Sequence, residues 1–452
     1  MSGYARELEM AGRIAEMAAE RGGRAWFVGG YVRDALWGRE NKDIDMEVHG
    51  LTPGQLEAVL DSLGQRLTMG ESFGIYALRG YGIDIAMPRK ETVRGSGHRD
   101  FDVFVDPFLG TEKAAARRDF TVNAMMRDIL TGEIRDHFGG REDLARRVLR
   151  HVNDRSFAED PLRVLRGAQF AARFAMTVAP ETVELCRGMK LDSLPRERIE
   201  GELKKALLKA ERPSIFFEVL RQMDQLGRWF PELEALIGVE QNPRFHAEGD
   251  VWTHTMLVLD AAAGQRHKVR EPYALMLAAL THDFGKAVCT ERIDGVIHAY
   301  GHETHGLPLA QRFLNRLTGE KRLTDHVLKL VEFHMKPNTM AAVGASVKST
   351  NRLFDSVPEP RALICLAEAD YQGQWIEGPS QSREPFLLER LAIYEQTMAR
   401  PCVMGQDLIA AGLTPGKAFS ELLAYAHKLR LAGIPKEDAL KQTLAQARKQ
   451  KK

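Results

Sequence analysis

Two aspartates, Asp43 and Asp45, are separated by one residue in the stretch KDIDMEV at 42–48. In a strand, side chains at i and i+2 project from the same face, roughly 7 Å apart. Both carboxylates could then hold one Mg²⁺ ion, which prefers carboxylate oxygens and leaves positions open for substrate phosphates. Magnesium held in this way assists in-line displacement at phosphorus. The alternative is that both aspartates belong to the solvated face of an edge strand.

Gly29 and Gly30 precede these aspartates in the stretch AWFVGGYVRD, which also contains Arg33. Glycines let backbone N–H groups approach a triphosphate closely, and an arginine at the start of the following helix adds positive charge. By themselves, the two glycines would indicate no more than a turn. The order GG, VRD and DID within one short stretch favours a nucleotide site over that interpretation.

Histidines are concentrated in the second half of the chain, where nine of the 14 lie between His246 and His334. Imidazole nitrogens and carboxylates from separate helices can bind one or two transition-metal ions and activate water toward a phosphate ester. The candidate ligands are His254, His282, Asp283, His302, His334 and Asp370. A buried histidine is more often a packed core residue than a ligand, so a single HD dipeptide would be weak evidence.

The composition narrows the class of protein. The chain has 452 residues, 44% hydrophobic and 28% charged, which predicts a globular protein of several domains. Its formal net charge is +1, so a nucleic-acid partner would be held by local basic patches. The four cysteines form no CxxC pair, which argues against a disulfide framework and a cysteine zinc site. No stretch approaches the ~18 apolar residues of a membrane span, so we expect a cytoplasmic protein with no membrane contact.

The elements that would position these residues differ between the two parts of the chain. Apolar runs alternate with turn residues from about residue 25 to 136, which predicts a small mixed sheet flanked by helices. From about residue 158 onward, apolar residues recur at helical spacing. The expected fold class is therefore α+β, with a small sheet near the start of the chain and helices after it.

Four motifs follow one another along the first half of the chain: GGYVRDALWGRENKDIDMEV (29–48), RRDFTVNAMM (117–126), EDPLRVLRGAQFAARF (159–174) and RERIEGELKKAL (196–207). Together they resemble the nucleotidyltransferase superfamily of DNA polymerase β. The version is that of bacterial class II tRNA nucleotidyltransferases (CCA-adding enzymes) and related poly(A) polymerases. The resemblance implies a catalytic head of the polymerase β type at 1–150. It also implies a helical neck at 151–240 for base recognition and RNA binding.

The resemblance also assigns roles to residues of the second motif, RRDFTVNAMM. It implies that Arg118 and Asp119 lie beside the nucleotide and help to set the position of its ribose and phosphates, whereas the role of Arg117 is left open. The alternative is that these arginines pair with a nearby carboxylate such as Asp136. Asp84, which alternates with two isoleucines, is either a third carboxylate beside the metal or an exposed strand position.

The motif EDPLRVLR suggests how a base is selected. In a helix, Asp160, Arg163 and Arg166 advance by three residues and lie near one face. An aspartate can accept from an amino group while an arginine donates to a ring nitrogen or carbonyl, and cytosine and adenine share that edge. Alternatively, Asp160 caps a helix that begins at Pro161, and one carboxylate could serve both purposes. The family usually has an arginine at the position of Gln169, which leaves the triphosphate contact there open.

The order of the histidines and aspartates resembles that of HD-domain phosphohydrolases, which some bacterial CCA-adding enzymes carry after their RNA-binding helices. The resemblance implies an HD domain at 241–375 and an RNA-binding helical tail at 376–452. It favours His302 over His305 as a ligand, because His302 matches the family's HExxG pattern. An active HD site with a divalent transition metal and an inactive scaffold are both open, as is the identity of the metal.

The expected function is template-independent addition of CTP and ATP to the tRNA 3′ end, which builds or repairs CCA, with Mg²⁺ bound by Asp43 and Asp45. A phosphatase or phosphodiesterase activity is expected of the HD domain. The segment 88–118 predicts a mobile loop of the kind that CCA-completing enzymes carry. The nearer alternative is an A-adding enzyme or poly(A) polymerase, and the more distant one is an HD phosphohydrolase whose inactive head binds RNA. The oligomeric state is open.

Overall fold

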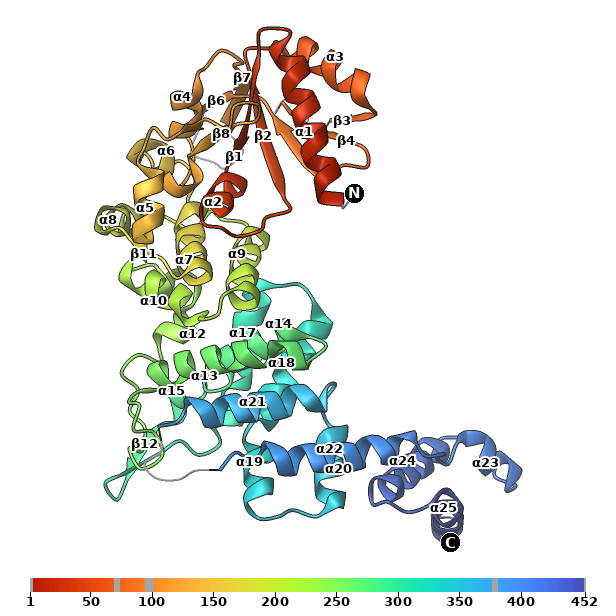
Figure 1. The fold of residues 1–452 in the computed structure, drawn as a ribbon. Coiled ribbons are helices and arrows are strands. Elements are labelled where there is room, and N and C mark those ends of the chain that lie inside the picture. The colour runs from red at the N-terminus through yellow and green to blue at the C-terminus, as the bar shows by residue number, and fades with distance from the viewer. Residues whose placement is uncertain (1–2, 69–73, 94–100, 376–380, 451–452) are drawn as a thin grey trace. The chain divides into compact units, whose positions relative to one another are not determined.

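A computed structural model of the chain describes residues 3–68, 74–93, 101–375 and 381–450. The chain divides into two compact units, one formed by Met1–Ala206 and Ile215–Trp229 and the other by Leu207–Ser214 and Phe230–Lys452. The first unit contains the main β-sheet, and the second is almost entirely helical (Figure 1). This confirms the expected α+β class with a small mixed sheet near the start of the chain.

The sheet of the first unit has the strand order β3-β4-β5-β2-β1-β8-β9. Its strands are β1 (Arg24–Val28), β2 (Ile44–His49), β3 (Arg66–Thr68), β4 (Ile75–Leu78), β5 (Ile83–Ala86), β8 (Met126–Asp128) and β9 (Ile134–Arg135). Strands β2 and β5 run parallel, whereas β1 pairs antiparallel with β2 and β8. Three helices accompany these strands in Figure 1: α1 (Gly3–Ala19), α2 (Gly30–Leu36) and α3 (Pro53–Leu63).

The residue pattern of β2 determines which way its carboxylates point. Ile44, Met46 and Val48 are each at most 1% exposed, and helix α1 packs against β1 and β2. Asp45 and Glu47 alternate with them along the strand. Because successive side chains of a strand point to opposite faces, the apolar residues that anchor β2 in the core also turn the carboxylates to the other face.

The helices that follow the sheet, up to α11, belong mostly to the first unit. They are α4 (Thr111–Ala116), α5 (Gly140–Arg146), α6 (Asp154–Ala158), α7 (Leu162–Phe174), α8 (Pro180–Arg187), α9 (Arg196–Lys209), α10 (Ser214–Gln222) and α11 (Leu226–Trp229). A 3₁₀ turn lies at Thr121–Asn123, and β10 (Val148–Leu149) and β11 (Thr177–Val178) form a parallel strand pair.

Phe120 is fully buried, and its ring packs edge-on against Phe157 and Phe170, with centroid distances of 5.5 and 5.7 Å. The motif RRDFTVN is thereby anchored to α6 and α7.

The segment predicted as a mobile loop, 88–118, contains two strands. Strand β6 (Arg89–Val93) pairs antiparallel with β7 (Phe101–Val105), and helix α4 follows. The residues between the strands, 94–100, lie outside the described part of the chain. Glycines and mixed charge indicated a loop, but the β-branched and aromatic residues of the flanking stretches favour strands.

The second unit is built around α14 (Pro272–Thr281), which is buried from Tyr273 to Thr281. The other elements are α12 (Pro231–Glu234), α13 (Val251–Gln265), a 3₁₀ turn at Arg266–Lys268, α15 (Lys286–Cys289), β12 (Glu291–Ile293), β13 (Val296–His298), α16 (His302–His305), α17 (Leu307–Leu317), α18 (Lys321–Phe333), α19 (Met335–Ala342), α20 (Val347–Asp355), α21 (Pro360–Gly373), α22 (Glu384–Ala399), α23 (Gly405–Ala410), α24 (Ala418–Leu431) and α25 (Lys436–Gln450). Helices α13, α18 and α21 contact α14. A helix that is apolar all round is expected at the centre of a helical core.

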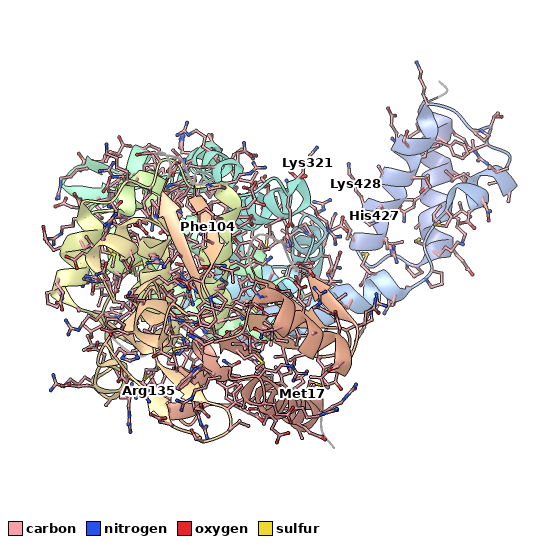
Figure 2. The ribbon with its side chains drawn as sticks, turned by 90° about the horizontal axis from the view of Figure 1, so that it is seen from above. Met17, Phe104, Arg135, Lys321, His427 and Lys428 are labelled. Atoms are coloured by element: carbon pink, nitrogen blue, oxygen red, sulfur yellow. The ribbon has the colours of Figure 1, made fainter. Side chains whose placement is uncertain are left out.

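The closing helices, α23 to α25, have a small core of their own. Its buried members are Val403, Leu408, Leu422, Ala426, Ala439 and Ala447. His427, labelled in Figure 2, lies with its Nε2 2.8 Å from Oδ2 of Asp355 in α20. The buried side chain of Asn351 donates to the carbonyl of Leu431 at 2.9 Å. These two contacts attach α24 to α20 within the second unit.

Two features bear on the expectations drawn from composition. The four cysteines are free thiols. Within the described ranges, the helices are too short or too polar to cross a membrane.

Candidate active sites

The paired aspartates lie beside a third carboxylate. Asp45 of β2 is directly opposite Asp84 of β5 in the parallel register, and Asp43 immediately precedes β2. Asp43 and Asp84 are exposed, and Asp45 is half-buried. Burial and then the negative charge of Asp84 raise the pKa of Asp45, with a further contribution from Asp43. Such a gathering of like charges is relieved by a divalent cation with oxygen ligands, so these residues fit the Mg²⁺ that the sequence predicts.

The glycine pair brings the backbone close to these carboxylates. Gly29 has φ 67° and ψ −137°, a conformation that side chains disfavour. A Cβ atom at Gly29 would lie 3.2 Å from Nη1 of Arg118 and 3.5 Å from Oδ2 of Asp45. Gly30 begins α2, and a Cβ there would lie 3.5 Å from Nη2 of Arg33. The GG turn therefore sits against the aspartate and the arginine that the sequence assigns to metal and nucleotide.

Glu47 is a site residue that the sequence analysis missed. It is 1% exposed, and its Oε2 lies 3.5 Å from Nη2 of Arg117 and 3.6 Å from Nη2 of Arg118. Burial alone would raise the pKa of Glu47, but the hydrogen bond to His49 and the charge of Arg118 lower it to about 2. The signal for Glu47 was its spacing, because it continues the alternation that begins at Asp43.

Asp136, the alternative partner proposed for Arg117 and Arg118, has a different role. Both oxygens of Asp136 accept hydrogen bonds from backbone N–H groups at the start of α5, from Gly140 at 2.8 Å and Arg141 at 2.9 Å. The structure thus places Arg117 and Arg118 beside Glu47 of β2, on the strand that carries Asp45.

Arg33 is held inside the first unit. It is 4% exposed, its Nε donates to Oδ1 of Asp34 at 2.8 Å, and its Nη1 donates to Oδ1 of Asn123 at 2.7 Å. The guanidinium also lies 4.3 Å from the ring centroid of Phe174. Burial lowers the pKa of Arg33, and the charge of Asp34 opposes that shift. The sequence predicts this arginine beside a triphosphate, whereas the structure surrounds it with protein partners.

Asn41 extends this set of contacts to Asp43, one of the predicted metal ligands. Its Nδ2 donates to Oδ2 of Asp34 at 2.8 Å, and its Oδ1 accepts from the backbone N–H of Asp43 at 3.0 Å. The position of Asp43 is therefore tied through Asn41 and Asp34 to the buried Arg33. Neither asparagine of this network was singled out from the sequence.

Asn123 continues the same network in the other direction. Its Nδ2 donates to Oδ1 of Asp119 at 3.0 Å, and Oδ2 of Asp119 accepts from Nε of Arg166 at 2.9 Å. Burial by itself would raise the pKa of Asp119, but Arg166 and Asn123 hold it below its usual value. We call this chain of hydrogen bonds, from Asp43 through Asn41, Asp34, Arg33, Asn123 and Asp119 to Arg166, the buried relay. It joins three of the sequence motifs.

The proposed base-reading residues lie at the start of α7. Oδ1 of Asp160 accepts from the backbone N–H of Leu162 at 3.1 Å, and Oδ2 accepts from Nη2 of Arg198 at 3.0 Å. Arg163 donates from Nη1 to the carbonyl of Ser156 at 2.8 Å and from Nη2 to the carbonyl of Arg117 at 2.7 Å. Helix α7 begins at Leu162 with Pro161 at its N-cap position, one residue later than the sequence predicts, although the Asp160 carboxylate still accepts from the first N–H of the helix. This half-exposed carboxylate can accept further hydrogen bonds.

Two other residues of the neck, Arg198 and Gln169, differ from what the sequence analysis led us to expect. Arg198, from the fourth motif, was not singled out, although it pairs with Asp160. Gln169, which stands where the family usually has an arginine, is 1% exposed. Its Nε2 makes no hydrogen bond to the described residues. This side chain therefore lies inside the unit, and nothing in the structure shows a phosphate contact for it.

In the second unit, three histidines present the same ring nitrogen to a common centre. Each Nδ1 faces the backbone carbonyl three residues earlier, at 2.9 Å for His282 and Ala279, 2.9 Å for His302 and Ala299, and 2.7 Å for His334 and Val331. A carbonyl only accepts, so each Nδ1 carries the proton and each Nε2 keeps a lone pair. This is the tautomer that coordination of a metal through Nε2 requires.

The lone pairs converge on Asp283. Nε2 of His302 lies 3.2 Å from Nε2 of His334 and 3.3 Å from Oδ1 of Asp283. Nε2 of His282 lies 3.2 Å from Oδ2 of the same carboxylate, and among the described residues it has no hydrogen-bond partner. Facing lone pairs repel unless a cation lies between them, so this donor set fits a divalent metal ion.

Asp370 and His254 complete the cluster. Nε2 of His254 lies 3.1 Å from Oδ1 of Asp370, and Nε2 of His282 lies 4.0 Å from the same atom. The ligand atoms form two groups within 4.8 Å, one of His254, His282 and Asp370 and the other of Asp283, His302 and His334. The structure thus brings all six predicted residues together. His305 is exposed, whereas His302 is buried in the cluster.

Glu248, Lys286 and His246 support the cluster and were missed as site residues. Oε1 of Glu248 lies 2.9 Å from Nδ1 of His254 and 2.7 Å from Nδ1 of His246. Burial would lower the pKa of His254, but hydrogen bonds to Asp370 and Glu248 raise it to about 9. Lys286 lies with its Nζ 2.6 Å from Oδ2 of Asp283, one helical turn after that aspartate in HDFGK.

A close backbone approach brings His302 to Asp283. A Cβ atom at Gly285 would lie 2.0 Å from the carbonyl oxygen of His302 and 2.7 Å from the backbone nitrogen of Gly306. Only glycine permits this approach. The glycine in HDFGK therefore holds the first turn of α15 against α16, which carries His302.

Comparisons with known proteins match both the part of the chain that carries the aspartates and the part that carries the histidines. A model described as the poly(A) polymerase head domain matches residues 25–150, and one described as the HD domain matches residues 251–372. The fold is similar to that of the Thermotoga maritima CCA-adding enzyme complexed with tRNA, with a TM-score of 0.65 and 22% identity, covering 97% of this chain and 95% of that one. It is also similar to a CCA-adding enzyme in complex with CTP, with a TM-score of 0.68, 21% identity and the same coverage. The class is a nucleotidyltransferase head combined with an HD domain.

Sequence relatives identify the family. The chain is 40% identical over 427 residues to the multifunctional CCA protein of Halorhodospira halophila, covering 91% of this chain and 97% of that protein. It is 39% identical over 360 residues to the multifunctional CCA protein of Actinobacillus pleuropneumoniae, covering 77% and 85%. The chain belongs to this family, the multifunctional CCA proteins, which are tRNA nucleotidyltransferases.

Replacing Asn123 tests the buried relay. We expect Asn123→Ala to lower the rate of nucleotide addition by roughly 5- to 100-fold, because it removes one hydrogen bond from the buried Arg33 and one from the buried Asp119, at a cost of about 1–3 kcal/mol. Single-turnover addition to a tRNA transcript measures the effect, with thermal unfolding in parallel. Asn315→Ala, on the exposed face of α17, is the control. A normal rate in a folded Asn123→Ala variant would contradict the assigned role.

Replacing Gly285 tests the close approach in the metal cluster. We expect Gly285→Ala to lower the stability of the second unit by about 1–3 kcal/mol, because the added methyl group must displace the backbone of α16. Equilibrium dialysis with Co²⁺ should show weaker binding, and calorimetry a lower Tm. Gly264→Ala is the matched control, since a Cβ there meets nothing within 4 Å. Equal Co²⁺ affinity in the two variants would refute this account of Gly285.

Proposed function

We propose that this protein adds CTP and ATP to the tRNA 3′ end without a nucleic-acid template and so builds or repairs CCA. The observation that carries the proposal is the register of Asp45 against Asp84, with Asp43 and the Gly29 turn beside them. This arrangement, in a chain of the multifunctional CCA family, is a phosphoryl-transfer site with a place for Mg²⁺. The substrates of the solved complexes, tRNA and CTP, support the choice of partners.

The transfer step follows from these residues. The terminal ribose 3′-oxygen bonds to the α-phosphorus of the incoming nucleotide, the bond to the β-phosphate oxygen breaks, pyrophosphate leaves with the electron pair, and the hydroxyl proton passes to solvent. Asp43 and Asp45 would hold Mg²⁺, which supplies positive charge next to the reacting phosphate. Arg118 and the backbone of Gly29 and Gly30 would orient the triphosphate. Catalysis then comes mainly from positioning and charge stabilisation.

Base selection is assigned to the start of α7. Asp160 would accept from the amino group that cytosine and adenine share, and Arg163 would donate to the neighbouring ring atom. Uracil and guanine present a carbonyl toward Asp160 and are rejected. Arg166 and Asp119, paired in the relay, would keep the ribose side of the site in place. Arg33, with its buried partners, would act on the nucleotide through the relay.

The neck and tail helices would hold the tRNA. We retain the division into a head at 1–150, a neck at 151–240, an HD domain at 241–375 and a tail at 376–452, and the family-model matches at 25–150 and 251–372 support the first and third. Free cysteines fit the reducing conditions of the cytoplasm, where we place this activity.

We infer a second activity for the HD domain, hydrolysis of phosphomonoesters or 2′,3′-cyclic phosphates. The supporting observation is the convergence of Nε2 lone pairs on Asp283. A divalent transition metal held there would activate water. The water oxygen bonds to phosphorus, one ribose–phosphate bond breaks, and the released ribose oxygen takes up a proton. Lys286, next to Asp283, would add positive charge toward the phosphate.

Asp45→Asn tests the nucleotidyltransferase proposal. On a tRNA transcript that lacks its last three nucleotides, we expect the unmodified protein to add two residues with CTP and a third when ATP is present, and none with UTP or GTP. Asp45→Asn should lower the rate roughly a thousandfold, since a metal-binding charge is lost without a change of shape. Asp61→Asn, an exposed position of α3, is the control.

Two other outcomes of this assay are informative. An inert transcript together with a single A added to one that ends in CC would identify an A-adding enzyme. No addition to any transcript, with hydrolysis intact, would favour a phosphohydrolase whose head only binds RNA.

His302→Asn tests the second activity. We expect it to abolish hydrolysis of cytidine 2′,3′-cyclic phosphate while CCA addition stays within twofold, because the two sites use different residues. His305→Asn is the matched control on the same helix turn and should keep the hydrolysis rate. Removal of metal with a chelator and addition of Mn²⁺, Co²⁺ or Ni²⁺ in turn would identify the ion. Equal hydrolysis by the His302 and His305 variants would exclude the assigned ligand.

A further inference from the structure

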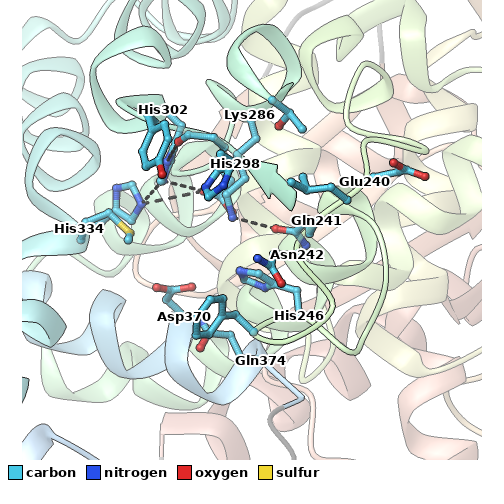
Figure 3. A pocket seen from close by; sticks show the side chains of 17 residues that line it. Glu240, Gln241, Asn242, His246, Lys286, His298, His302, His334, Asp370 and Gln374 are labelled. Carbon is cyan, nitrogen blue, oxygen red and sulfur yellow. Dashed lines mark hydrogen bonds and ion pairs between the residues drawn. The ribbon is translucent and has the colours of Figure 1, made fainter. Parts of the chain in front are cut away.

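A pocket of about 340 Å³ opens directly onto the metal-ligand cluster of the second unit (Figure 3). Asp283, His302, His334 and Asp370 line one part of it. The close-up shows His302, His334 and Asp370 around the cavity that their side chains share with Gln241 and Asn242. The pocket is thus large enough for more than a phosphate group, and the metal ligands occupy only part of its wall.

Aromatic rings line another part of this pocket. The rings of His298 and Tyr300 stack with a centroid distance of 4.8 Å and an interplanar angle of 15°. Tyr300 is 67% exposed, and Phe245, from a different segment, is 52% exposed. All three residues line the pocket. Flat, exposed rings that line a cavity are suited to stack on the planar ring of a ligand.

The stacked rings are fixed relative to the metal ligands. His298 ends β13, where it pairs with Glu291 of β12, and Tyr300 stands two residues before His302. Lys286, also in the pocket wall, is held between Asp283 and Oε1 of Gln241, with Nζ–O distances of 2.6 and 2.8 Å. The pocket therefore combines a site for a phosphate at one part of its wall with a platform for a flat ring at another.

We infer that this pocket is a nucleotide subsite, in which the phosphate lies at the metal-ligand cluster and Lys286 while the base stacks on the His298–Tyr300 pair. The inference rests on the proposed hydrolase activity and assigns the residues that would hold the base of its substrate. Because every base has a flat face, stacking tolerates all four. The ligand is either a free mononucleotide or the 3′-terminal nucleotide of an RNA strand, which share this chemistry.

Tyr300→Ala in the full-length protein tests this subsite. With cytidine 2′,3′-cyclic phosphate as substrate, we expect the KM to rise roughly 5- to 100-fold with little change in kcat, as for loss of one stacking contact. Tyr300→Phe keeps the ring and should retain the KM. Ile293→Ala, exposed on the same hairpin and outside the pocket, is the matched control. Hydrolysis of glycerol 2-phosphate, which has no base, should be equal in all four proteins.

The outcomes separate this inference from the proposed function. An unchanged KM in Tyr300→Ala and in Phe245→Ala would overturn the subsite. If the unmodified protein hydrolyses no ester with any metal, the hydrolase proposal fails. Equilibrium dialysis of cytidine 3′-monophosphate in the presence of Mn²⁺ then tests the subsite by itself. Tyr300→Ala should remove one class of binding sites, and a binding isotherm equal to that of the unmodified protein would overturn the subsite.

A short RNA that ends in a 2′,3′-cyclic phosphate identifies the source of the ligand. A lower KM for the RNA than for the mononucleotide, lost in Tyr300→Ala, would identify the 3′ end of an RNA as the ligand. Equal values for both substrates, again dependent on Tyr300, would identify the free nucleotide.

Discussion

The arrangement of the first unit's motifs depends above all on the ion pair between the buried Asp119 and the half-buried Arg166. A buried carboxylate is costly unless its charge is paired and its lone pairs are used, and Asp119 meets that requirement through Arg166, Asn123 and the backbone N–H of Phe120. Phe120, next in sequence, is inserted between the rings of two following helices. The motif RRDFTVN is thus fixed by polar contacts on one side and apolar packing on the other, and its two arginines pair with Glu47 of β2.

In the second unit, the buried carboxylate of Asp283 is likewise shared among several partners. The two oxygens of Asp283 face different histidines, His302 through Oδ1 and His282 through Oδ2. The histidines are oriented by carbonyls of their own backbone, so their direction is set as soon as the local helical turns form. His282, His302 and His334 owe their direction to main-chain bonds, whereas side chains orient His254 and align most residues of the relay in the first unit.

Local spacing was sufficient for some of the site and insufficient for the rest. The alternation of β2 predicted the face on which Asp45 lies, although Asp43 lies just before the strand, and the family's HExxG pattern selected His302. Asp84 was ambiguous because its role depends on the register between β5 and β2, which pairing across the sheet decides. Glu47 and Asn123 were missed because a buried glutamate or asparagine has the same sequence signal as an exposed one. Their roles come from partners that lie far away along the chain.

The buried relay also affects how this enzyme can change over evolutionary time. Its hydrogen bonds run without interruption from the backbone of Asp43 to Arg166. Residues that share such a network do not contribute independently to free energy. A substitution at one end of the relay, such as Arg166, would therefore also alter the hydrogen bonds that hold Asp43 at the other end. Changes that keep the network intact need partners in separate motifs, so asparagine and arginine positions of the relay should covary among related sequences.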